Sequence, residues 1–375
     1  MNARVLDFLV GVPLVFLGSF FGRKEPPPGS ISRILVIKLA AIGDAILLIP
    51  VLQQLRKAFP SARIDWLCSP INESVARQAA GVDELIVKRS NTPVELWRLA
   101  KKLRARRYDA VIDAEQWARG TAILSFLSGA PVRCGFDTPG QHRAGLFTRT
   151  EKKTFSRHEI DEFTALFAKL GPVDGSRSLS LKETDAGRRE LEDKVPEIMG
   201  VTKRPLVLIH PGCGEDGLPR EWPLERYAAI GKALEKDYSA LLLLSAGPDD
   251  QNKTKNLNNL LDGKAVDLGG RLSLEGSFSL VNRADLVISG NTGIMHIAAA
   301  LGKPQVAIHG PTNPLLWGPL NPKAIVIQTN CQDCPCLKLG FEYHRRDGAC
   351  MERITVDEVK KAADRLLGAQ KLPVR

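Results

Sequence analysis

Short runs of aliphatic and β-branched residues alternate with longer stretches of helical periodicity along most of the chain. Alternation of this kind predicts parallel sheets whose strands are joined by helices. The runs predicted as strands span residues 33–38, 63–68, 84–88, 109–113, 205–210, 239–246, 286–289 and 305–309. The stretches predicted as helices include residues 43–59, 94–107, 159–170, 274–283 and 293–301.

The alternation is interrupted twice. Residues 135–153 are rich in Gly, Arg and Thr and are predicted to be less regular, and residues 171–204 are mostly polar. Because the alternation starts afresh after the second interruption, we predict two Rossmann-like α/β domains that face a cleft, spanning residues 31–185 and 186–375. A chain of 375 residues is long enough for each domain to bury its own core.

Residues 1–30 follow a different pattern. Residues 5–22 are almost entirely apolar, and two basic residues and three prolines follow them. We expect residues 1–30 to form a hydrophobic membrane-associating segment with a Pro-rich hinge, in which residues 5–24 bind the anionic surface of a membrane as an anchor. A hydrophobic helix docked on the chain's own core is the alternative.

Two other interpretations of this segment are disfavoured. A cleaved signal peptide has a basic start and a small-residue cleavage site, whereas only Arg4 precedes the apolar run and no such site follows it. A spanning helix needs about 20 apolar residues, and Asp7, Gly11 and Pro13 weaken this run. Contact of Arg23–Lys24 with anionic headgroups is the better explanation of the flanking charge.

The formal charge of +10 favours a polyanionic partner. The basic residues concentrate at 101–107 and 143–153 without an aromatic platform between them, and the chain carries none of the motifs of a nucleic-acid reader. We therefore expect no nucleic-acid partner. Solvated helix faces account for most of the charge, and an anionic lipid or a sugar phosphate is the best functional partner.

The seven cysteines divide into two groups. Cys68, Cys134 and Cys213 stand alone in or beside apolar runs and are predicted to be reduced core residues, which suits a cytoplasmic protein. The other four are Cys331, Cys334, Cys336 and Cys350. Their spacing is not a standard zinc pattern, so we predict no metal. A reduced or redox-prone thiol group is the favoured interpretation, and a structural metal is the alternative.

Candidate chemistry begins where the first predicted strand ends. Gly43 lets the backbone approach a ligand, and Asp44 lies near the start of the next helix, whose dipole stabilises a carboxylate. A carboxylate in this place can act as a general base toward a hydroxyl, and a helix N-cap is the alternative role. Because only one glycine is present, the segment is not a dinucleotide fingerprint.

The first strand of the second domain is followed by a similar loop. His210 ends the strand, Gly212 follows in the sequence HPGCG, and Arg220 opens the next helix in the sequence REWP. Glycines beside a positive charge suit a diphosphate, so we predict that Arg220 neutralises charge on a leaving diphosphate. An ordinary surface arginine is the alternative.

A third candidate loop follows the strand at 286–289. Asn291, Thr292 and Gly293 form a tight turn into a helix, and free N–H groups at a helix start bind anions. The Thr292 hydroxyl and the Asn291 amide can add hydrogen bonds to a phosphate or ribose. His296 lies one turn further along the same face, although a histidine in an apolar helix is more often a core residue.

Five segments occur in one order along the chain. They are ILVIKLAAIGD at 34–44, HPG at 210–212, REWP at 220–223, NTGIMH at 291–296 and GPTNP at 310–314. Together they resemble glycosyltransferase family 9, the ADP-heptose:lipopolysaccharide heptosyltransferases, over roughly residues 31–365. The sequence RHE at 157–159 and the Cys-rich tail are also similar to members of this family.

The resemblance implies a GT-B fold and an inverting, metal-independent transfer that uses no cofactor. A sugar, typically heptose, would move from a nucleotide diphosphate sugar, typically ADP-heptose, to a lipopolysaccharide-core or other lipid-linked saccharide acceptor. Asp44 would deprotonate the acceptor hydroxyl and Arg220 would meet the charge of the departing diphosphate. The donor-binding residues implied are His210, Gly212, Asn291, Thr292, Gly293 and His296. The acceptor-side residues implied are Gly43, Glu115 and Arg157.

Two departures from the family pattern affect this expectation. The family commonly has lysine at the position of Arg220 and aspartate at that of Asn291. Arginine preserves the charge and can bind a diphosphate with two donors, but asparagine removes a carboxylate. A nucleotide-sugar epimerase and a catalytically inactive, membrane-tethered nucleotide- or sugar-binding protein are the alternative functions. For a transferase we expect a cytoplasmic location with peripheral attachment to the bacterial inner membrane.

Overall fold

The computed structural model describes residues 3–20, 29–201, 203–329, 334–338, 342–343 and 348–369. The predicted hinge at 26–28 and the basic pair Arg23–Lys24 lie outside these residues. The chain divides into two compact units, residues 1–178 and 179–375, whereas the sequence pattern placed the division at 185/186.

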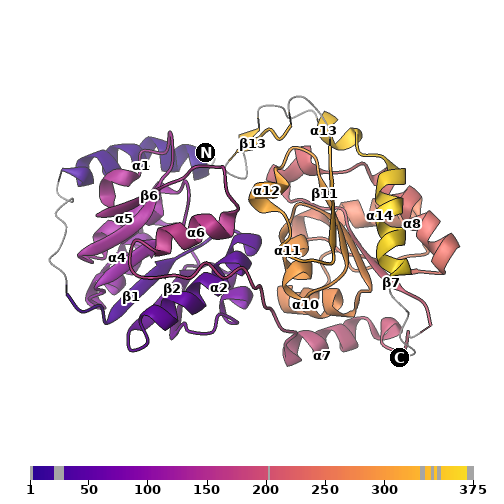
Figure 1. Cartoon of the computed structure of the whole chain (residues 1–375), viewed down its shortest axis with the longest axis horizontal. Coiled ribbons are helices and arrows are strands. Elements are labelled where there is room, and N and C mark those ends of the chain that lie inside the picture. Colours follow the sequence, from indigo (N-terminus) through magenta and orange to yellow (C-terminus); the bar gives the residue numbers. More distant parts are fainter. Residues whose placement is uncertain are drawn as a thin grey trace. The chain divides into compact units, whose positions relative to one another are not determined.

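The N-terminal unit is built on a parallel six-stranded sheet in the order β3-β2-β1-β4-β5-β6. Its strands are β1 Arg33–Ile37, β2 Arg63–Cys68, β3 Glu84–Val87, β4 Ala110–Asp113, β5 Val132–Asp137 and β6 Arg149–Lys152. Its helices after the first are α2 Ile42–Ala58, α3 Glu73–Ala76, α4 Pro93–Ala105, α5 Arg119–Leu127, η1 Ala144–Leu146 and α6 Glu159–Phe167. The central strands are aliphatic throughout because helices cover both faces of the sheet (Figure 1).

The C-terminal unit repeats this architecture with the strand order β12-β11-β10-β7-β8-β9, again parallel throughout. Its strands are β7 Leu206–His210, β8 Leu241–Leu244, β9 Val266–Asp267, β10 Leu286–Gly290, β11 Gln305–His309 and β12 Ala324–Gln328. Its longer helices are α7 Asp185–Lys194, α8 Leu224–Tyr238, α9 Gln251–Leu260, α10 Leu274–Arg283, α11 Gly293–Ala300 and α14 Val356–Gly368. The helix α14 and the strands β7 and β10 share one apolar core.

In each sheet there is one place where the chain connections run outward in opposite directions from two neighbouring strands. In the N-terminal unit the neighbours at this place are β1 and β4, and in the C-terminal unit they are β7 and β10. Helices on either side of such a switch point leave a crevice outside the carboxyl ends of the two strands, where open α/β sheets bind ligands. The loops that follow these four strands carry the residues that the sequence pointed to.

The apolar N-terminal segment forms a helix, α1, at Ala3–Ser19. It packs against α5 and η1 of the N-terminal unit, and Val15 joins Leu146 and Phe147 in a small buried cluster. The alternative of a helix docked on the chain's own structure therefore describes one face of α1 correctly. None of the helices in the described part of the chain has the length and apolar character needed to cross a bilayer.

The cysteines agree only in part with expectation. Cys68, Cys134 and Cys213 are free, as predicted, and the first two are buried. In the tail, Cys334 and Cys350 are joined in a disulfide, which differs from reduced thiols and agrees with redox-prone ones; Cys336 is buried. Cys331 lies outside the described residues. Among the side chains that are described, no group of His, Cys, Asp or Glu is arranged to hold a metal ion.

Candidate active site

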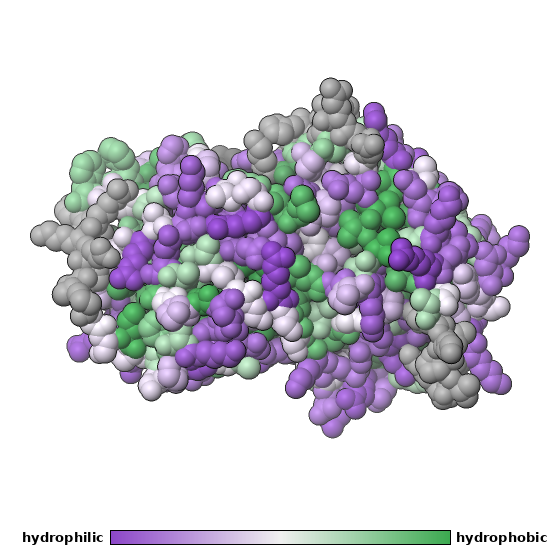
Figure 2. Space-filling model, viewed as in Figure 1, coloured by the Kyte–Doolittle hydropathy of each residue, from purple (hydrophilic) through white to green (hydrophobic). Residues whose placement is uncertain are grey.

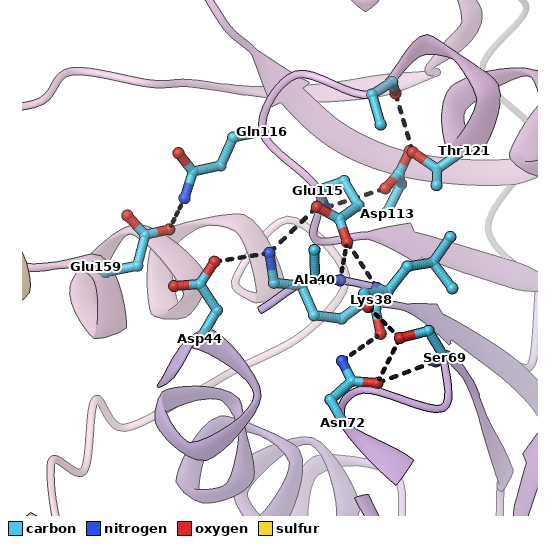
Figure 3. Close-up of polar contacts among 12 residues, drawn as sticks. Lys38, Ala40, Asp44, Ser69, Asn72, Asp113, Glu115, Gln116, Thr121 and Glu159 are labelled. Carbon is cyan, nitrogen blue, oxygen red and sulfur yellow. Dashed lines mark hydrogen bonds and ion pairs between the residues drawn. The ribbon is translucent and has the colours of Figure 1, made fainter. Parts of the chain in front are cut away.

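The loop after β1 is held on both sides by buried polar groups. Glu115, in the loop after the neighbouring strand β4, accepts hydrogen bonds from the backbone N–H groups of Leu39 and Ala40 at 2.6 and 2.9 Å (Figure 3). On the opposite edge of the loop, the carbonyls of Leu39 and Lys38 accept hydrogen bonds from the side chains of Ser69 and Asn72. Glu115 therefore fixes the backbone of the loop that leads to Asp44.

Lys38 forms ion pairs with both Glu115 and the candidate base, Asp44. Its ammonium is buried and lies 2.8 Å from the Asp44 carboxylate and 3.2 Å from that of Glu115. Burial opposes the charged form, but the two carboxylates outweigh it and raise the pKa of Lys38 above its ordinary value. Lys38 is thus a permanent cation at physiological pH.

Asp44 is not the N-cap of α2. The N-cap is Ala41, and Asp44 lies in the first turn with its side chain turned to Lys38. Its side chain keeps 25% exposure, whereas those of Lys38 and Glu115 are almost fully buried. Asp44 is accordingly the carboxylate of this ion-pair group that a substrate can reach, while Gly43 beside it is buried.

A third carboxylate belongs to the same group. Glu159, at the start of α6, accepts hydrogen bonds from Gln116 and from Lys153, each at 2.5 Å. Burial, with the nearby Asp44 charge adding to it, raises the pKa of Glu159, although Lys153 and Lys38 oppose this. We call Lys38, Asp44, Glu115, Gln116, Lys153 and Glu159 the N-terminal half-site.

The charges of the N-terminal half-site do not cancel. Two ammonium groups face three carboxylates, so the group carries one excess negative charge when all five are ionised. Asp44 is the more exposed carboxylate of this group. It can therefore accept the proton of a hydroxyl that approaches from solvent.

Arg157 lies outside this group. Its guanidinium forms ion pairs with Glu151 at 2.5 Å and with Glu162 at 3.1 Å. Hydrogen bonds to Glu151 and Glu162 raise its pKa although burial opposes this. Among the described side chains no contact joins Arg157 to Asp44 or Glu115, so the structure gives it a role in fixing α6 to β6.

The loop after β7 makes a very close contact with the segment after β8. A Cβ atom added to Gly212 would lie 2.4 Å from Oδ2 of Asp250, and the same oxygen accepts a hydrogen bond from the N–H of Gly214 at 2.8 Å. Although burial opposes it, hydrogen bonds from Lys253 and Gly214 lower the pKa of Asp250. The glycine at 212 is therefore required by a carboxylate packed against the backbone.

Arg220 connects the two loops at the switch point. Its guanidinium donates to the backbone carbonyl of Asn291 at 3.1 Å and to that of Cys213 at 3.3 Å. The described side chains include no carboxylate paired with it, because the neighbouring Glu221 is paired with Lys253. Arg220 is half-buried and holds a positive charge that the described side chains do not neutralise, and this disagrees with an ordinary surface arginine.

Two histidines of this unit, His210 and His309, do not add to that charge. Burial lowers the pKa of His210 to about 4, and its ring lies 3.0 Å from the Ser245 hydroxyl. Burial, with His296 and Arg220 adding to it, lowers the pKa of His309 to about 3. Both rings are therefore neutral near pH 7. Burial likewise raises the pKa of the Cys213 thiol to about 12, so it is not a nucleophile.

The start of α11 presents polar atoms that are buried and unpaired. The Thr292 and Ser289 hydroxyls and Nε2 of His309 have no hydrogen-bond partner among the described atoms. Thr292 is the N-cap of α11 and Gly293 its first residue, so free N–H groups lie beside these atoms. His296 and the Asn291 side chain are buried. Together with Arg220 and the loop after β7, we call these residues the C-terminal half-site.

Sequence reasoning found part of each half-site. Asp44, Gly43 and Glu115 lie together in the N-terminal unit, and Arg157 does not join them. In the C-terminal unit the predicted residues occupy the two loops of the switch point. The structure adds Lys38, Glu159, His309, Asp250 and Lys253. One signal in the sequence pointed to Lys38 and His309, because each is the last residue of a predicted strand.

Two parallel α/β units, each with a polar loop pair at its switch point, are the architecture of the GT-B fold, which solved structures of glycosyltransferase family 9 members share. A family model of glycosyltransferase family 9 (heptosyltransferase) matches residues 96–344. The chain belongs to glycosyltransferase family 9 and is a glycosyltransferase.

Individual relatives agree with this assignment. Lipopolysaccharide heptosyltransferase 1 of Escherichia coli O18:K1:H7 is 25% identical over 345 residues, which cover 88% of this chain and 99% of the relative. Lipopolysaccharide heptosyltransferase 2 of Salmonella typhimurium is 25% identical over 311 residues, covering 79% and 88%. The E. coli ADP-heptose lps heptosyltransferase II structure has the same fold, with a TM-score of 0.71, 23% identity and coverage of 90% and 99%.

Proposed function

We propose that the protein transfers heptose from ADP-heptose to a sugar hydroxyl of a lipopolysaccharide-core acceptor, with inversion and without a metal ion. The observation that carries the proposal is the Lys38–Asp44–Glu115 group at the switch point of the N-terminal sheet. The family supports glycosyl transfer, and the names of the curated relatives support the choice of donor and acceptor. The epimerase alternative has no comparable support.

In this proposal Asp44 is the general base. It removes the proton from the acceptor hydroxyl as the oxygen attacks the anomeric carbon of the donor sugar, and the bond to the diphosphate breaks on the opposite face. Lys38 does not touch the substrate; it positions the Asp44 carboxylate through the 2.8 Å ion pair. Glu115 positions the loop through its two backbone hydrogen bonds.

The departing diphosphate needs positive charge and hydrogen-bond donors. Arg220 is the cation that suits this role, because Lys253 is already matched by Asp250 and Glu221. The N–H groups at the start of α11 and the Thr292 hydroxyl add donors. These groups replace the divalent cation that many nucleotide-sugar enzymes use, so we propose that transfer proceeds in the presence of EDTA.

The Asp44→Asn variant tests the proposal. Release of ADP from ADP-heptose should require an acceptor in the wild-type protein and should fall by roughly 10²–10⁴-fold in the variant, because the base is lost while size is kept. ADP binding, measured by calorimetry, should stay within about twofold, since the residues proposed to bind the diphosphate belong to the C-terminal unit and Asp44 to the N-terminal one.

Glu95→Gln is the matched control. Glu95 also lies in the first turn of a helix, α4, and its ion pair with Arg98 is exposed. This variant removes a carboxylate from a helix start elsewhere in the same unit and should transfer at the wild-type rate. Near-wild-type transfer by Asp44→Asn would show that another group is the base.

A further inference from the structure

The helix α1 exposes most of its large apolar residues and packs its small and polar residues against the N-terminal unit, which is the reverse of an ordinary surface helix. The residues that face the N-terminal unit are small or polar: Asp7 is half-buried, and Gly11, Val15 and Gly18 are buried. They recur every three or four residues, as one helical stripe does. Apart from Val15, the large apolar residues of α1 whose exposure is described therefore lie outside the buried core of the unit.

Tight backbone contacts explain why this stripe is small. A Cβ atom on Gly11 would lie 2.8 Å from Cβ of Arg119, and one on Gly18 would lie 2.6 Å from Cδ2 of Leu146. The stripe brings the helix backbone close to α5 and η1, and Asp7 fastens it there. Asp7 accepts hydrogen bonds from the N–H groups of Arg119 and Gly120 and pairs with the Arg119 guanidinium at 3.0 Å.

The outward face is apolar over its whole described length. Its exposed large residues are Phe8, Leu9, Val10, Leu14, Phe16, Leu17 and Phe20, with exposed fractions from 46% to 71%. The rest of the described chain exposes only eight large apolar residues, and these are scattered. Figure 2 shows this gathering of apolar residues at the upper left, over the end of α1. A continuous patch of this kind marks an interaction surface.

The neighbouring surface carries positive charge. The crossovers from β3 to β4 and from β4 to β5 place α4 and α5 on one face of the sheet, and α1 packs on α5. The helix α4 exposes four basic residues, Arg98, Lys101, Lys102 and Arg104, against one exposed acidic residue. It also exposes Trp97, whose ring lies 3.6 Å from the Lys101 ammonium. Tryptophan beside lysine is typical of a membrane–water interface.

We infer that α1 and α4 form a docking surface for an anionic lipid bilayer, with the outward face of α1 inserted among the lipids and the basic residues of α4 at the headgroups. The helix lies in the interface, because one stripe along it is fixed to the protein by Asp7, Gly11 and Gly18. An apolar face without polar groups, next to excess positive charge, suits anionic lipid better than a second copy of this chain.

This surface lies next to the loop of the N-terminal half-site. Asp7 bonds the first residues of α5, and the loop before α5 carries Glu115 and Gln116. A bilayer bound by α1 would bring a lipid-linked acceptor to the Asp44 side of the protein. The docking surface stands on its own observations, but its use in catalysis rests on the proposed function.

Sedimentation with lipid vesicles tests the inference. The full-length protein is mixed with vesicles of phosphatidylcholine with or without phosphatidylglycerol, and no donor or acceptor is added. We expect binding to the phosphatidylglycerol vesicles, weaker binding to neutral ones, and about tenfold or greater loss in the Phe16→Ser/Leu17→Ser variant, because both side chains point outward. Leu315→Ser, which alters an even more exposed apolar side chain in the C-terminal unit, is the control and should bind as the wild type does.

Three results would overturn the inference. They are absence of wild-type binding at every lipid concentration, unchanged binding by the double variant, and a solution dimer that this variant dissociates, which would assign the face to a second copy. Equal binding to neutral vesicles would overturn the role given to α4. Transfer to a deacylated, water-soluble core acceptor, measured in parallel, should be the same in the double variant and the wild type. Loss of that activity in both proteins would contradict the proposed function and leave the docking result intact.

Discussion

Lys38 shows how one buried cation organises several acids. Its ammonium holds Asp44 and Glu115 in fixed positions, and its Coulombic effect reaches Glu159. A buried ammonium is unfavourable unless it is paired on more than one side, and here three carboxylates surround it. The buried groups of the N-terminal half-site therefore stay ionised because each charge is stabilised by neighbouring charges of the opposite sign.

His309 gives a pH dependence that can be measured at one residue. Its pKa is lowered to about 3 by burial, then by His296 and Arg220, whereas an unfolded histidine titrates near 6.5. Between these values the unfolded chain binds a proton that the folded chain does not, so acidification from pH 6.5 favours unfolding. We expect His309 to cost about 1.4 kcal/mol of stability per pH unit over this window.

The measurement compares denaturant unfolding of the wild type and His309→Gln at pH 7, 6 and 5. The free energy of unfolding should fall less steeply with acidification in the variant. His142→Asn is the control, because His142 is exposed and its removal should leave the slope unchanged. Equal slopes for the wild type and His309→Gln would contradict the burial of a neutral ring.

Most of the single residues that the sequence pointed to lie at the ends of strands or in the loops that follow them. Asp44, His210 and Asn291 were found in this way. Glu159 was passed over as a site residue because its partner Gln116 is 43 residues away, and His309 because its neutrality comes from packing. Arg157 stays a prediction on the acceptor side, and the acids that the structure places against it, Glu151 and Glu162, are its neighbours only after folding.

At the scale of elements, the loop after β7 depends on one glycine. Gly212→Ala would force its new Cβ against Asp250, and backbone shifts of this kind typically cost about 1–3 kcal/mol. We expect ADP to bind roughly tenfold more weakly or worse, because the displaced loop also carries the carbonyl that Arg220 bonds. Calorimetric titration with ADP measures the effect.

Gly247→Ala is the matched control for this change. Gly247 lies in the loop after the neighbouring strand β8, and a Cβ atom there would meet nothing within 4 Å. Its backbone has a negative φ that alanine adopts without strain. The control should bind ADP as the wild type does, and a Gly212→Ala protein that also did so would show that the close contact is dispensable.

Eight strands of the two sheets could be predicted, whereas β5, β6, β9 and β12 could not, and the last three are edge strands. The predicted runs coincide with β1, β2, β3 and β4 and with β7, β8, β10 and β11. The region predicted as less regular contains β5 and β6, and β12 was also missed. In β6 and β12, exposed and half-buried positions mix because each is an edge strand. In β5, the buried Arg133 interrupts the apolar run, and its guanidinium is bonded to backbone carbonyls.

At the scale of the whole molecule, the division into two units predicts a selective response to nucleotide. ADP that binds only the folded C-terminal unit should stabilise it by about 2.7 kcal/mol at a hundred times the dissociation constant. Where thermal unfolding resolves two transitions, the one that belongs to residues 179–375 should move and the other should not.

The same experiment tests which nucleobase the donor nucleotide carries. UDP and GDP should shift the transition less than ADP, and Arg220→Ala should abolish the shift. Arg188→Ala, which removes an exposed arginine of the same unit, should retain it. An equal shift of both transitions would mean that the nucleotide contacts both units.

The bond between Asp7 and the start of α5 links residues 112 positions apart. A protein trimmed to begin after the proline run, as is common when an apolar leader is removed for crystallisation, would uncover Arg119, against which Phe8 and Gly11 pack, and take away its counter-charge. It would also leave two backbone N–H groups at the head of α5 without their acceptor. Residues 3–20 thus belong to the folding unit rather than to a removable tail, and affinity tags and fusion partners are better placed at the carboxyl end.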